Sequence, residues 1–146
     1  MKIVVQKTHG CKLFVEENLI SEIGSGLILF VGVHKDDTME CVDYLARKIT
    51  HMRLFKDEND KINNSVLDIG GDVMVVSNFT LNAEISSGTR PSFSNSADPT
   101  TANMLYLALA EKIRENGINH VATGAFGEHM HLSTTLDGPF NIVIER

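Results

Sequence analysis

The stretch GLILFVGV, residues 26–33, is the feature that most restricts how this chain can fold. It is almost continuously apolar and rich in branched side chains, a pattern typical of a central strand that is covered on both faces. With 146 residues, of which 42% are hydrophobic, the chain is long enough for one compact domain and short for two. We therefore expect a single domain, residues 1–146, built around this strand.

Further runs of β-type sequence are spread along the chain. Glu17 and Asn18 form a plausible turn into LISEI, within an N-terminal meander, and DENDK, residues 57–61, is a polar turn. Strands are expected at residues 2–8, 11–17, 73–77, 120–126, 129–135 and 140–145.

Two helices are also predicted. The first covers about residues 38–51, where Asp36 and Asp37 offer an N-cap. The second begins at Asp98-Pro99 and runs to about Asn116-Gly117, because Asp is a good cap, Pro suits the first turn and Gly suits the left-handed terminus. The expected buried positions are Met39, Val42, Leu45, Ile49 and Met52 in the first helix and Leu105, Leu109 and Ile113 in the second. The sequence thus predicts a mixed α/β fold with sheets packed against two main helices.

Location and charge narrow the possible functions. No window approaches the length of apolar sequence that a membrane span needs, and Cys11 and Cys41 are isolated thiols without CxxC spacing. Both observations favour the cytoplasm. The net charge of −6 argues against wholesale attraction to nucleic acid.

Four cations gather in a short stretch of this acidic chain. They are Arg47, Lys48, Arg53 and Lys56. Such a cluster is either a small phosphate-binding face or a solvated helix face.

The usual catalytic and cofactor motifs are missing from the sequence. It contains no HExxH, GxSxG, P-loop or GxGxxG pattern. His129 and His131 would point to one face of a strand, where they could share a metal, but no third ligand is evident. We therefore expect neither a metal nor an organic cofactor.

Ser77 and Thr80 follow the buried strand at 73–77 and precede a long irregular segment, residues 82–99. Backbone N–H groups freed at such a point can bind an anion or an oxyanion. The two hydroxyls can equally terminate the strand through local hydrogen bonds. Gly138-Pro139 likewise has an ordinary interpretation as a turn between two strands.

The whole chain resembles the D-aminoacyl-tRNA deacylases, also called D-tyrosyl-tRNA deacylases. The similarity includes MKIVVQK, IGSGLILFVGV, GTRPSFS and TGAFGEHM, in the same order as in the family. The family motif SQxTL is present as SNFTL, residues 77–81, and NxGPxT is present as LDGPFN, residues 136–141. Asn78, Leu136 and Asn141 therefore differ from the family residues.

This resemblance implies hydrolysis of the ester that joins a D-amino acid, or glycine, to the 3′-terminal adenosine of tRNA. It implies a homodimer with the active site at the subunit interface. Gly138-Pro139 would have a cis peptide and project into the partner's site, where its backbone leaves no room for an L side chain.

The resemblance also implies roles for individual residues. Backbone N–H groups near Phe79 and Thr80 would hold the oxyanion, while Ser77 and Asn78 shape the site. Thr80 is a candidate nucleophile, with assistance from the ribose 2′-hydroxyl as the favoured alternative. Met130 and Phe79 would contact the adenosine, although core packing also explains them.

Two other functions are compatible with the altered motifs. The altered flanks of Gly138-Pro139 could relax chirality, giving a deacylase for mischarged L-aminoacyl-tRNA. A non-catalytic paralogue that binds nucleic acid is the alternative from a different class.

Overall fold

The computed structural model describes residues 1–86 and 88–146. Its helices are α1 (Met39–His51), α2 (Pro99–Glu115) and the short 3₁₀ helix η1 (Phe79–Asn82). Its strands are β1 (Lys2–Val15), β2 (Asn18–Ile23), β3 (Gly26–Gly32), β4 (Phe55–Lys56), β5 (Ile62–Asn64), β6 (Asp72–Ser77), β7 (Val121–Thr123) and β8 (Met130–Glu145). The predicted mixed α/β fold, with two main helices packed on a sheet, is confirmed.

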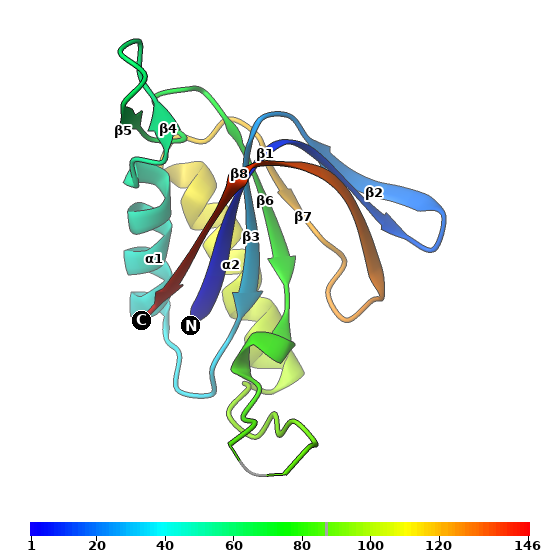
Figure 1. Cartoon of the computed structure of the whole chain (residues 1–146). Coiled ribbons are helices and arrows are strands. Elements are labelled where there is room, and N and C mark those ends of the chain that lie inside the picture. The colour runs from blue at the N-terminus through cyan, green and yellow to red at the C-terminus, as the bar shows by residue number, and fades with distance from the viewer. Residues whose placement is uncertain (87) are drawn as a thin grey trace.

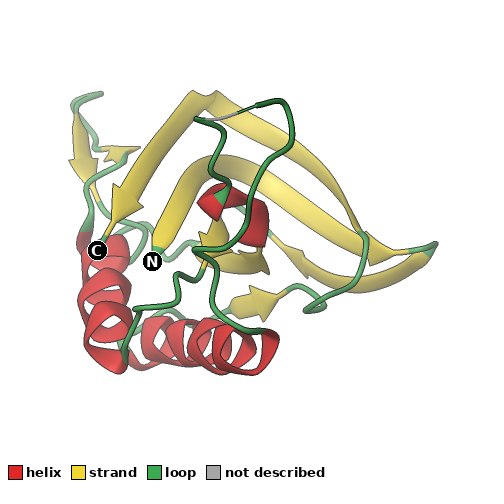
Figure 2. Cartoon of the chain, turned by 90° about the horizontal axis from the view of Figure 1, so that it is seen from below, coloured by secondary structure: helices red, strands yellow, loops and turns green. Residues whose placement is uncertain are grey.

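The main sheet has the order β2-β1-β3-β6-β7, and β8 pairs with the other edge of β1. The β3–β6 and β6–β7 pairs are parallel, whereas β1 is antiparallel to β2, β3 and β8. The long strands β1 and β8 curve together away from the helices (Figure 1). Seen from below, α1 and α2 lie on one side of the curved sheet (Figure 2). Neither helix has the length and apolar composition that a membrane crossing would need, as far as the described residues go.

Alternate side chains of β3 are buried in two different cores. Leu27 and Leu29 belong to the core between the sheet and the helices. Ile28 belongs to a second core on the opposite face, enclosed by the curved parts of β1, β2 and β8. The predicted central strand, covered on both faces, is thus confirmed. Its unbroken apolar run reflects two cores and not one.

The predicted strands at 2–8 and 11–17 are wrong as separate elements, because β1 runs without interruption from Lys2 to Val15. The pairing with β8 has an irregularity at Thr8 and Gly10, but it continues on both sides of it. The hydroxyl of Thr8 accepts a hydrogen bond from the Gly10 N–H at 3.0 Å and contacts the hydroxyl of Thr134 at 2.8 Å. Side-chain bonds therefore replace the backbone bonds that the irregularity removes.

The strands at the C-terminal end also differ from the prediction. The runs at 129–135 and 140–145 form the single strand β8. The strand expected at 120–126 is limited to Val121–Thr123. After Thr123 the chain passes beside the start of β8, where a Cβ at Gly124 would lie 2.7 Å from Met130 Sδ.

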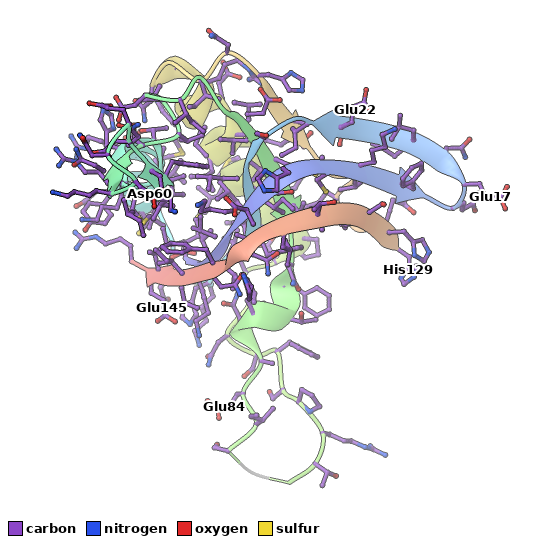
Figure 3. All side chains as sticks on the ribbon, turned by 45° about the horizontal axis from the view of Figure 1, so that its top comes forward. Glu17, Glu22, Asp60, Glu84, His129 and Glu145 are labelled. Carbon is purple, nitrogen blue, oxygen red and sulfur yellow. The ribbon has the colours of Figure 1, made fainter. Side chains whose placement is uncertain are left out.

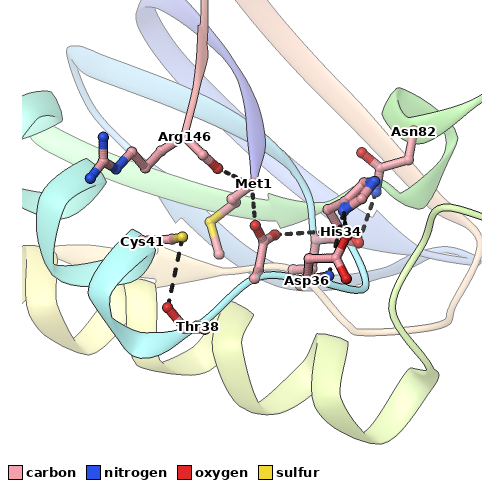
Figure 4. Close-up of polar contacts among 9 residues, drawn as sticks. Met1, His34, Asp36, Thr38, Cys41, Asn82 and Arg146 are labelled. Atoms are coloured by element: carbon pink, nitrogen blue, oxygen red, sulfur yellow. Dashed lines mark hydrogen bonds and ion pairs between the residues drawn. The ribbon is translucent and has the colours of Figure 1, made fainter.

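Helix α1 is confirmed, but its predicted cap is wrong. The N-cap is Thr38, which makes no capping hydrogen bond with its side chain. Asp37 instead binds the Met1 ammonium and accepts a bond from the His34 N–H at 2.6 Å (Figure 4). Met39, expected to be buried, is exposed. The carboxylate therefore ties the N-terminus to the β3–α1 loop and not to the helix.

Helix α2 matches its prediction at both ends. The carboxylate of Asp98 accepts hydrogen bonds from the N–H groups of Thr100 and Thr101 at 3.0 and 3.1 Å. Gly117 has a φ of 106°, a backbone conformation that favours glycine. Three predicted core residues are buried, namely Leu105, Leu109 and Ile113. These signals fix where α2 starts, and hence where its first turn meets the sheet.

Tyr106 connects α2 to the sheet through a buried hydroxyl. The hydroxyl donates to the Val75 carbonyl at 2.9 Å. Replacing Tyr106 by phenylalanine should lower the free energy of unfolding by about 1 to 2 kcal/mol, because that carbonyl loses a partner. Urea denaturation at neutral pH measures this difference, and equal midpoints for the two proteins would contradict it.

The same substitution predicts a pH dependence. Burial raises the pKa of Tyr106 to about 12, whereas an unfolded tyrosine ionises near pH 10. The stabilisation by Tyr106 is therefore fully present below pH 10 and is lost as the pH rises towards 12. The difference in unfolding free energy between wild type and Tyr106→Phe should shrink over this range.

Candidate active site

A cavity of about 520 Å³ lies where β3 and β6 end and α2 begins. Three predicted site residues from the SNFTL segment reach it, and Met130 reaches it from the start of β8. Its lining residues are Val31, Val33, Ser77, Asn78, Phe79, Ser96, Ala97, Pro99, Ala102, Tyr106, Phe126, Gly127, Glu128 and Met130. The cavity is thus mainly apolar, and Ser77 and Asn78 are among its few polar lining residues.

The backbone that follows Ser77 presents two free donors. The Asn78 N–H donates to the Val31 carbonyl at 2.7 Å, which holds the end of β6 against β3. The chain then turns into η1, whose first N–H groups have no partner within the helix. The N–H groups of Phe79 and Thr80 form no hydrogen bond with any described residue. Two adjacent N–H groups, unpaired among the described residues, therefore lie in the turn that carries Phe79, one of the residues that line the cavity.

The side chains of this segment have separate surroundings. The hydroxyl of Thr80 donates to the amide oxygen of Asn78, and Thr80 does not line the cavity. Phe79 is 58% exposed, and its ring meets that of Phe93 edge-on at a centroid distance of 4.9 Å. Ser96 donates to the Phe79 carbonyl at 3.4 Å. An exposed aromatic ring therefore stands beside the free backbone donors.

Gly32 allows η1 to lie close to the end of β3. A Cβ at this position would lie 3.0 Å from Leu81 Cβ and 3.2 Å from the Asn78 carbonyl oxygen. These distances are tighter than ordinary van der Waals contact. The absence of a side chain at Gly32 thus sets the position of the whole turn.

Gly138-Pro139 forms a bulge in β8. The peptide bond between the two residues is cis. In the pairing with β1, Leu136 is opposite Thr8 and Asn141 is opposite Gln6. The four residues from 137 to 140 therefore face Lys7 alone. A bulge accommodates a proline within a strand, because its missing N–H is not needed for pairing there, and this explains why no turn divides β8.

The bulge and the cavity are separate in this chain. Gly138 and Pro139 are both exposed, and among the described residues neither lines the cavity that contains Ser77, Phe79 and Met130. The structure therefore brings the SNFTL segment and Met130 together. It places the Gly138-Pro139 backbone elsewhere, facing outward.

Lys7 holds the bulge from beneath. Its ammonium lies 3.0 Å from Asp137 Oδ2 and above the rings of Phe55 and Phe140, at 5.0 and 5.3 Å from their centroids. The Lys7 side chain is 11% exposed. Its hydrogen bond, and then its charge, lower the pKa of the Asp137 carboxyl. His9 adds a weaker contact at 3.8 Å. Asp137 is thereby fixed immediately before Gly138.

The two altered positions of LDGPFN lie at the ends of the bulge. Leu136 is 40% exposed, and Asn141 is also exposed. Within the described part of the chain, the Asn141 side chain has no hydrogen-bond partner. The bracing of the bulge therefore comes from Lys7 and Asp137 and not from residues 136 and 141.

His129 and His131 lie near the start of β8, at the far end of the curved strands (Figure 3). Their rings meet edge-on at a centroid distance of 5.0 Å. Over residues 1–86 and 88–146, no three His, Cys, Asp or Glu side chains gather in a way that could hold a metal ion.

Several residues of the site were missed by the sequence interpretation. Tyr106 and Phe126, whose rings are 6.0 Å apart, line the cavity, and Lys7 supports the bulge. Tyr106 and Phe126 belong to segments whose periodicity indicated only core or strand positions. Lys7 had one usable signal, because a lysine in an apolar alternating strand needs a charged partner. The identity of that partner depends on the register between β1 and β8.

Two solved structures show the same fold. The c-Myc DNA Unwinding Element Binding Protein matches with a TM-score of 0.94 and 31% identity, over 100% of this chain and 99% of that chain. A probable eukaryotic D-amino acid tRNA deacylase matches with a TM-score of 0.82, over 98% of this chain and 97% of that chain. The second pair is 16% identical, so it shows the fold alone.

Sequence comparison identifies relatives over nearly the whole chain. The D-aminoacyl-tRNA deacylases of Clostridioides difficile (strain 630) and Thermotoga petrophila are each 45% identical to it over 145 residues. Each alignment covers 99% of this chain and 97% of the relative. The sequence profile described as D-Tyr-tRNA(Tyr) deacylase matches residues 4–145. The chain therefore belongs to the D-Tyr-tRNA(Tyr) deacylase family.

Proposed function

We propose that this protein hydrolyses the ester between a D-amino acid, or glycine, and the 3′-terminal adenosine of tRNA. The observation that carries the proposal is the pair of free N–H groups, at Phe79 and Thr80, beside a mainly apolar cavity. Family membership supports the reaction class. The products are the free amino acid and tRNA, and no organic cofactor or metal takes part.

The two N–H groups act as the oxyanion hole. Water attacks the ester carbonyl carbon, and the carbonyl oxygen becomes negative. As the bond between that carbon and the ribose oxygen breaks, the proton lost by the attacking water passes through the ribose 2′-hydroxyl to the departing oxygen. Preorganised donors at the developing oxyanion contribute on the order of 3 kcal/mol each. Ser77 and Asn78 orient this turn, since they join it to the end of β6. An ester is already activated towards attack by water, so the site needs no strong general base.

The cavity binds the terminal adenosine. Phe79 presents an exposed ring at its edge and Met130 lies within it, and both are suited to contact with a flat base. Met130 also packs against the second core, so the core fixes its position. These contacts would place the ester near the free N–H groups.

Thr80 is not expected to be the nucleophile. Its hydroxyl donates to the Asn78 amide, and no imidazole or amine of a described residue accepts its proton. Assistance from the ribose 2′-hydroxyl of the substrate fits this geometry better.

Replacing Thr80 by alanine should therefore lower kcat less than about tenfold, because the backbone N–H remains. Removal of a true nucleophile can lower kcat by about 10⁶. Single-turnover deacylation measures the effect, and loss of that size in a folded variant would contradict the substrate-assisted mechanism.

Chirality is controlled by Gly138-Pro139 from a partner subunit of a homodimer. Three observations support this arrangement: the bulge is exposed, it does not line the cavity of its own chain, and Phe79 beside the cavity is also exposed. Backbone atoms at the Cα of the substrate would collide with an L side chain and leave a D side chain free. Such a wall excludes the wrong enantiomer without contacting the right one.

The protein is proposed to act in the cytoplasm. Cys11 and Cys41 are both free thiols, which suits a reducing compartment. Aminoacyl-tRNA, the proposed substrate, is present in the same compartment.

The decisive experiment is to incubate the purified protein with D-tyrosyl-, glycyl- and L-alanyl-tRNA and to follow loss of the ester. We expect the first two to be hydrolysed and the third to persist. Hydrolysis of the L-alanyl ester would instead support a deacylase with relaxed chirality, the hypothesis suggested by the altered motif residues Asn78, Leu136 and Asn141. Persistence of all three esters at high enzyme concentration would refute both.

A nucleic-acid-binding function without catalysis is the second candidate. It is favoured by the similarity to the c-Myc DNA Unwinding Element Binding Protein, at 31% identity. Binding of tRNA or DNA without ester hydrolysis would support it.

A further inference from the structure

A basic groove lies on the outer face of α1, away from the cavity that Ser77 and Met130 line. The basic groove is the hollow of about 580 Å³ lined by Tyr44, Arg47, Lys48, His51, Met52 and Arg53. Within α1, positions 44, 47, 48 and 51 have spacings of three and four residues and so share one helix face. Arg53 continues this face beyond the end of the helix.

The three strong cations of the groove have no ionic partners among the described residues. Arg47, Lys48 and Arg53 make no ion pair with a described carboxylate, and Arg53 donates only to the amide oxygen of Asn63 at 2.8 Å. Seven other cations each have a carboxylate within 4.0 Å, namely Lys2, Lys7, Lys12, Lys56, Lys112, Arg114 and Arg146. In a chain with a net charge of −6, this groove is a local excess of positive charge.

The acidic residues around the groove do not neutralise it. Glu40 and Asp43 on α1 pair with cations outside the groove, at 3.7 and 3.8 Å. Asp68 is held by Ser65, whose N–H and hydroxyl donate to it at 2.8 and 2.7 Å. These bonds lower the pKa of Asp68, and the nearby charges of Arg53 and His51 lower it further. One engaged carboxylate therefore faces three cations.

Stabilisation of α1 does not account for the whole cluster. Cations in the last turn of a helix interact favourably with its dipole, and Lys48 occupies that turn. Arg53, however, lies two residues beyond His51, where α1 ends. Arg47, Lys48 and Arg53 are positive charges on one face, and they repel one another unless an anion is present.

We propose that the basic groove binds the phosphate backbone of the tRNA whose 3′ end enters the cavity, an inference that rests on the proposed function. The cavity, at about 520 Å³, has room for the terminal nucleotide and its amino acid but not for the body of the tRNA. The rest of that polyanion must lie on a surface that is acidic overall. Guanidinium groups bind phosphate oxygens in a bidentate manner, and lysine adds a point charge.

The position of the groove suits a contact distant from the ester. Helix α1 ends beside β4, whereas η1 and the first turn of α2 lie at the opposite end of the molecule (Figure 1). The groove therefore contributes affinity for RNA without touching the reacting atoms. Its contacts are to phosphate, so it positions the tRNA and does not identify its sequence.

The test compares two triple variants of the full-length protein. Arg47→Gln/Lys48→Gln/Arg53→Gln removes the groove cations, and Lys2→Gln/Lys12→Gln/Lys112→Gln removes three paired cations from other surfaces. The affinity for uncharged tRNA is measured by fluorescence anisotropy over a range of KCl concentrations. For the groove variant we expect an affinity at least about tenfold lower and a log–log salt slope shallower by about 2. The control variant should match wild type, and equal effects of the two variants would overturn the proposal.

Hydrolysis separates this inference from the proposed function. Each protein is given D-tyrosyl-tRNA and, separately, 3′-O-D-tyrosyl adenosine, which has no phosphate backbone. In the groove variant, the ratio of kcat/KM for the tRNA to kcat/KM for the adenosine ester should fall about tenfold. An unchanged ratio would overturn the groove, whereas failure of wild type to hydrolyse either ester would overturn the proposed function. If the groove variant lost binding to phosphatidylserine vesicles but bound tRNA as wild type does, the groove would be a membrane-binding site and the proposal would be refuted.

Discussion

Replacing Lys7 by methionine should lower the preference for D- over L-aminoacyl esters by about tenfold to a hundredfold. The Lys7 ammonium fixes Asp137 at 3.0 Å, and Asp137 immediately precedes the proposed wall of Gly138 and Pro139. Methionine keeps an unbranched side chain but is one atom shorter, and it removes the ammonium that contacts Asp137 and lies above the Phe140 ring. A displacement of about 1 Å in a positioning group can change a rate by about 10², and a looser wall would admit an L side chain.

The measurement is kcat/KM for D-tyrosyl- and L-tyrosyl-tRNA with each variant. We expect the rate with the L ester to rise, while the rate with the D ester changes little. Lys12→Met is the matched control. Lys12 lies on the same strand, but its side chain is exposed and its contact with Glu22 is longer, at 3.8 Å. It should leave the ratio unchanged.

A double-mutant cycle tests the pair directly. Asp137→Asn should reproduce the effect of Lys7→Met, and the combined variant should show less than the product of the two single effects, since both remove one contact. Independent effects, or an unchanged D-over-L ratio in Lys7→Met, would show that the ion pair does not position the wall.

The parts of the fold that were predictable are those with local causes. The continuous apolar run of GLILFVGV predicts a central strand, and both of its faces are buried. Asp98, Pro99 and Gly117 predict α2, because they mark its ends. The error at α1 has a tertiary cause. Asp37 resembles a cap in the sequence, yet its carboxylate binds the Met1 ammonium, which is distant in the chain. No local pattern contains that information.

Long strands interrupted by irregularities were harder to predict. Gly10 and Gly138-Pro139 are strand breakers in a local interpretation, and each marks an irregularity in a continuous strand. What keeps β1 and β8 continuous is their pairing with each other over nearly their full length. Because pairing over such a sequence separation leaves no local trace, the sequence predicted four strands where the structure has two.

The candidate site was predictable only in part for the same reason. The position of Ser77 at the end of a buried strand follows from the sequence, and its convergence with Met130 followed from family resemblance. The support of Asp137 by Lys7 depends on the register of β1 with β8. The separation of Gly138-Pro139 from the cavity is a property of the folded chain. It makes a second subunit necessary to the proposed mechanism.

Replacing Gly32 by alanine should lower kcat by about tenfold with a smaller change in KM. The added Cβ would lie 3.0 Å from Leu81 Cβ and 3.2 Å from the Asn78 carbonyl oxygen. Neither atom can swing away as the end of a flexible side chain would. The whole η1 turn must therefore shift by a few tenths of an ångström. Since Phe79 and Thr80 donate from this turn, the proposed oxyanion hole moves away from the oxygen it should stabilise.

Gly10→Ala is the matched control, because the same added Cβ would lie 3.5 Å from the Ile23 carbonyl oxygen, an ordinary contact. Overpacking at Gly32 should also lower the free energy of unfolding by about 1 kcal/mol, so deacylation is measured well below the melting temperature of both variants. A fall in kcat confined to Gly32→Ala would tie catalysis to the position of η1. If Gly32→Ala kept the kcat of wild type, the Phe79 and Thr80 N–H groups could not be the donors, because those groups cannot keep their positions once the turn has moved.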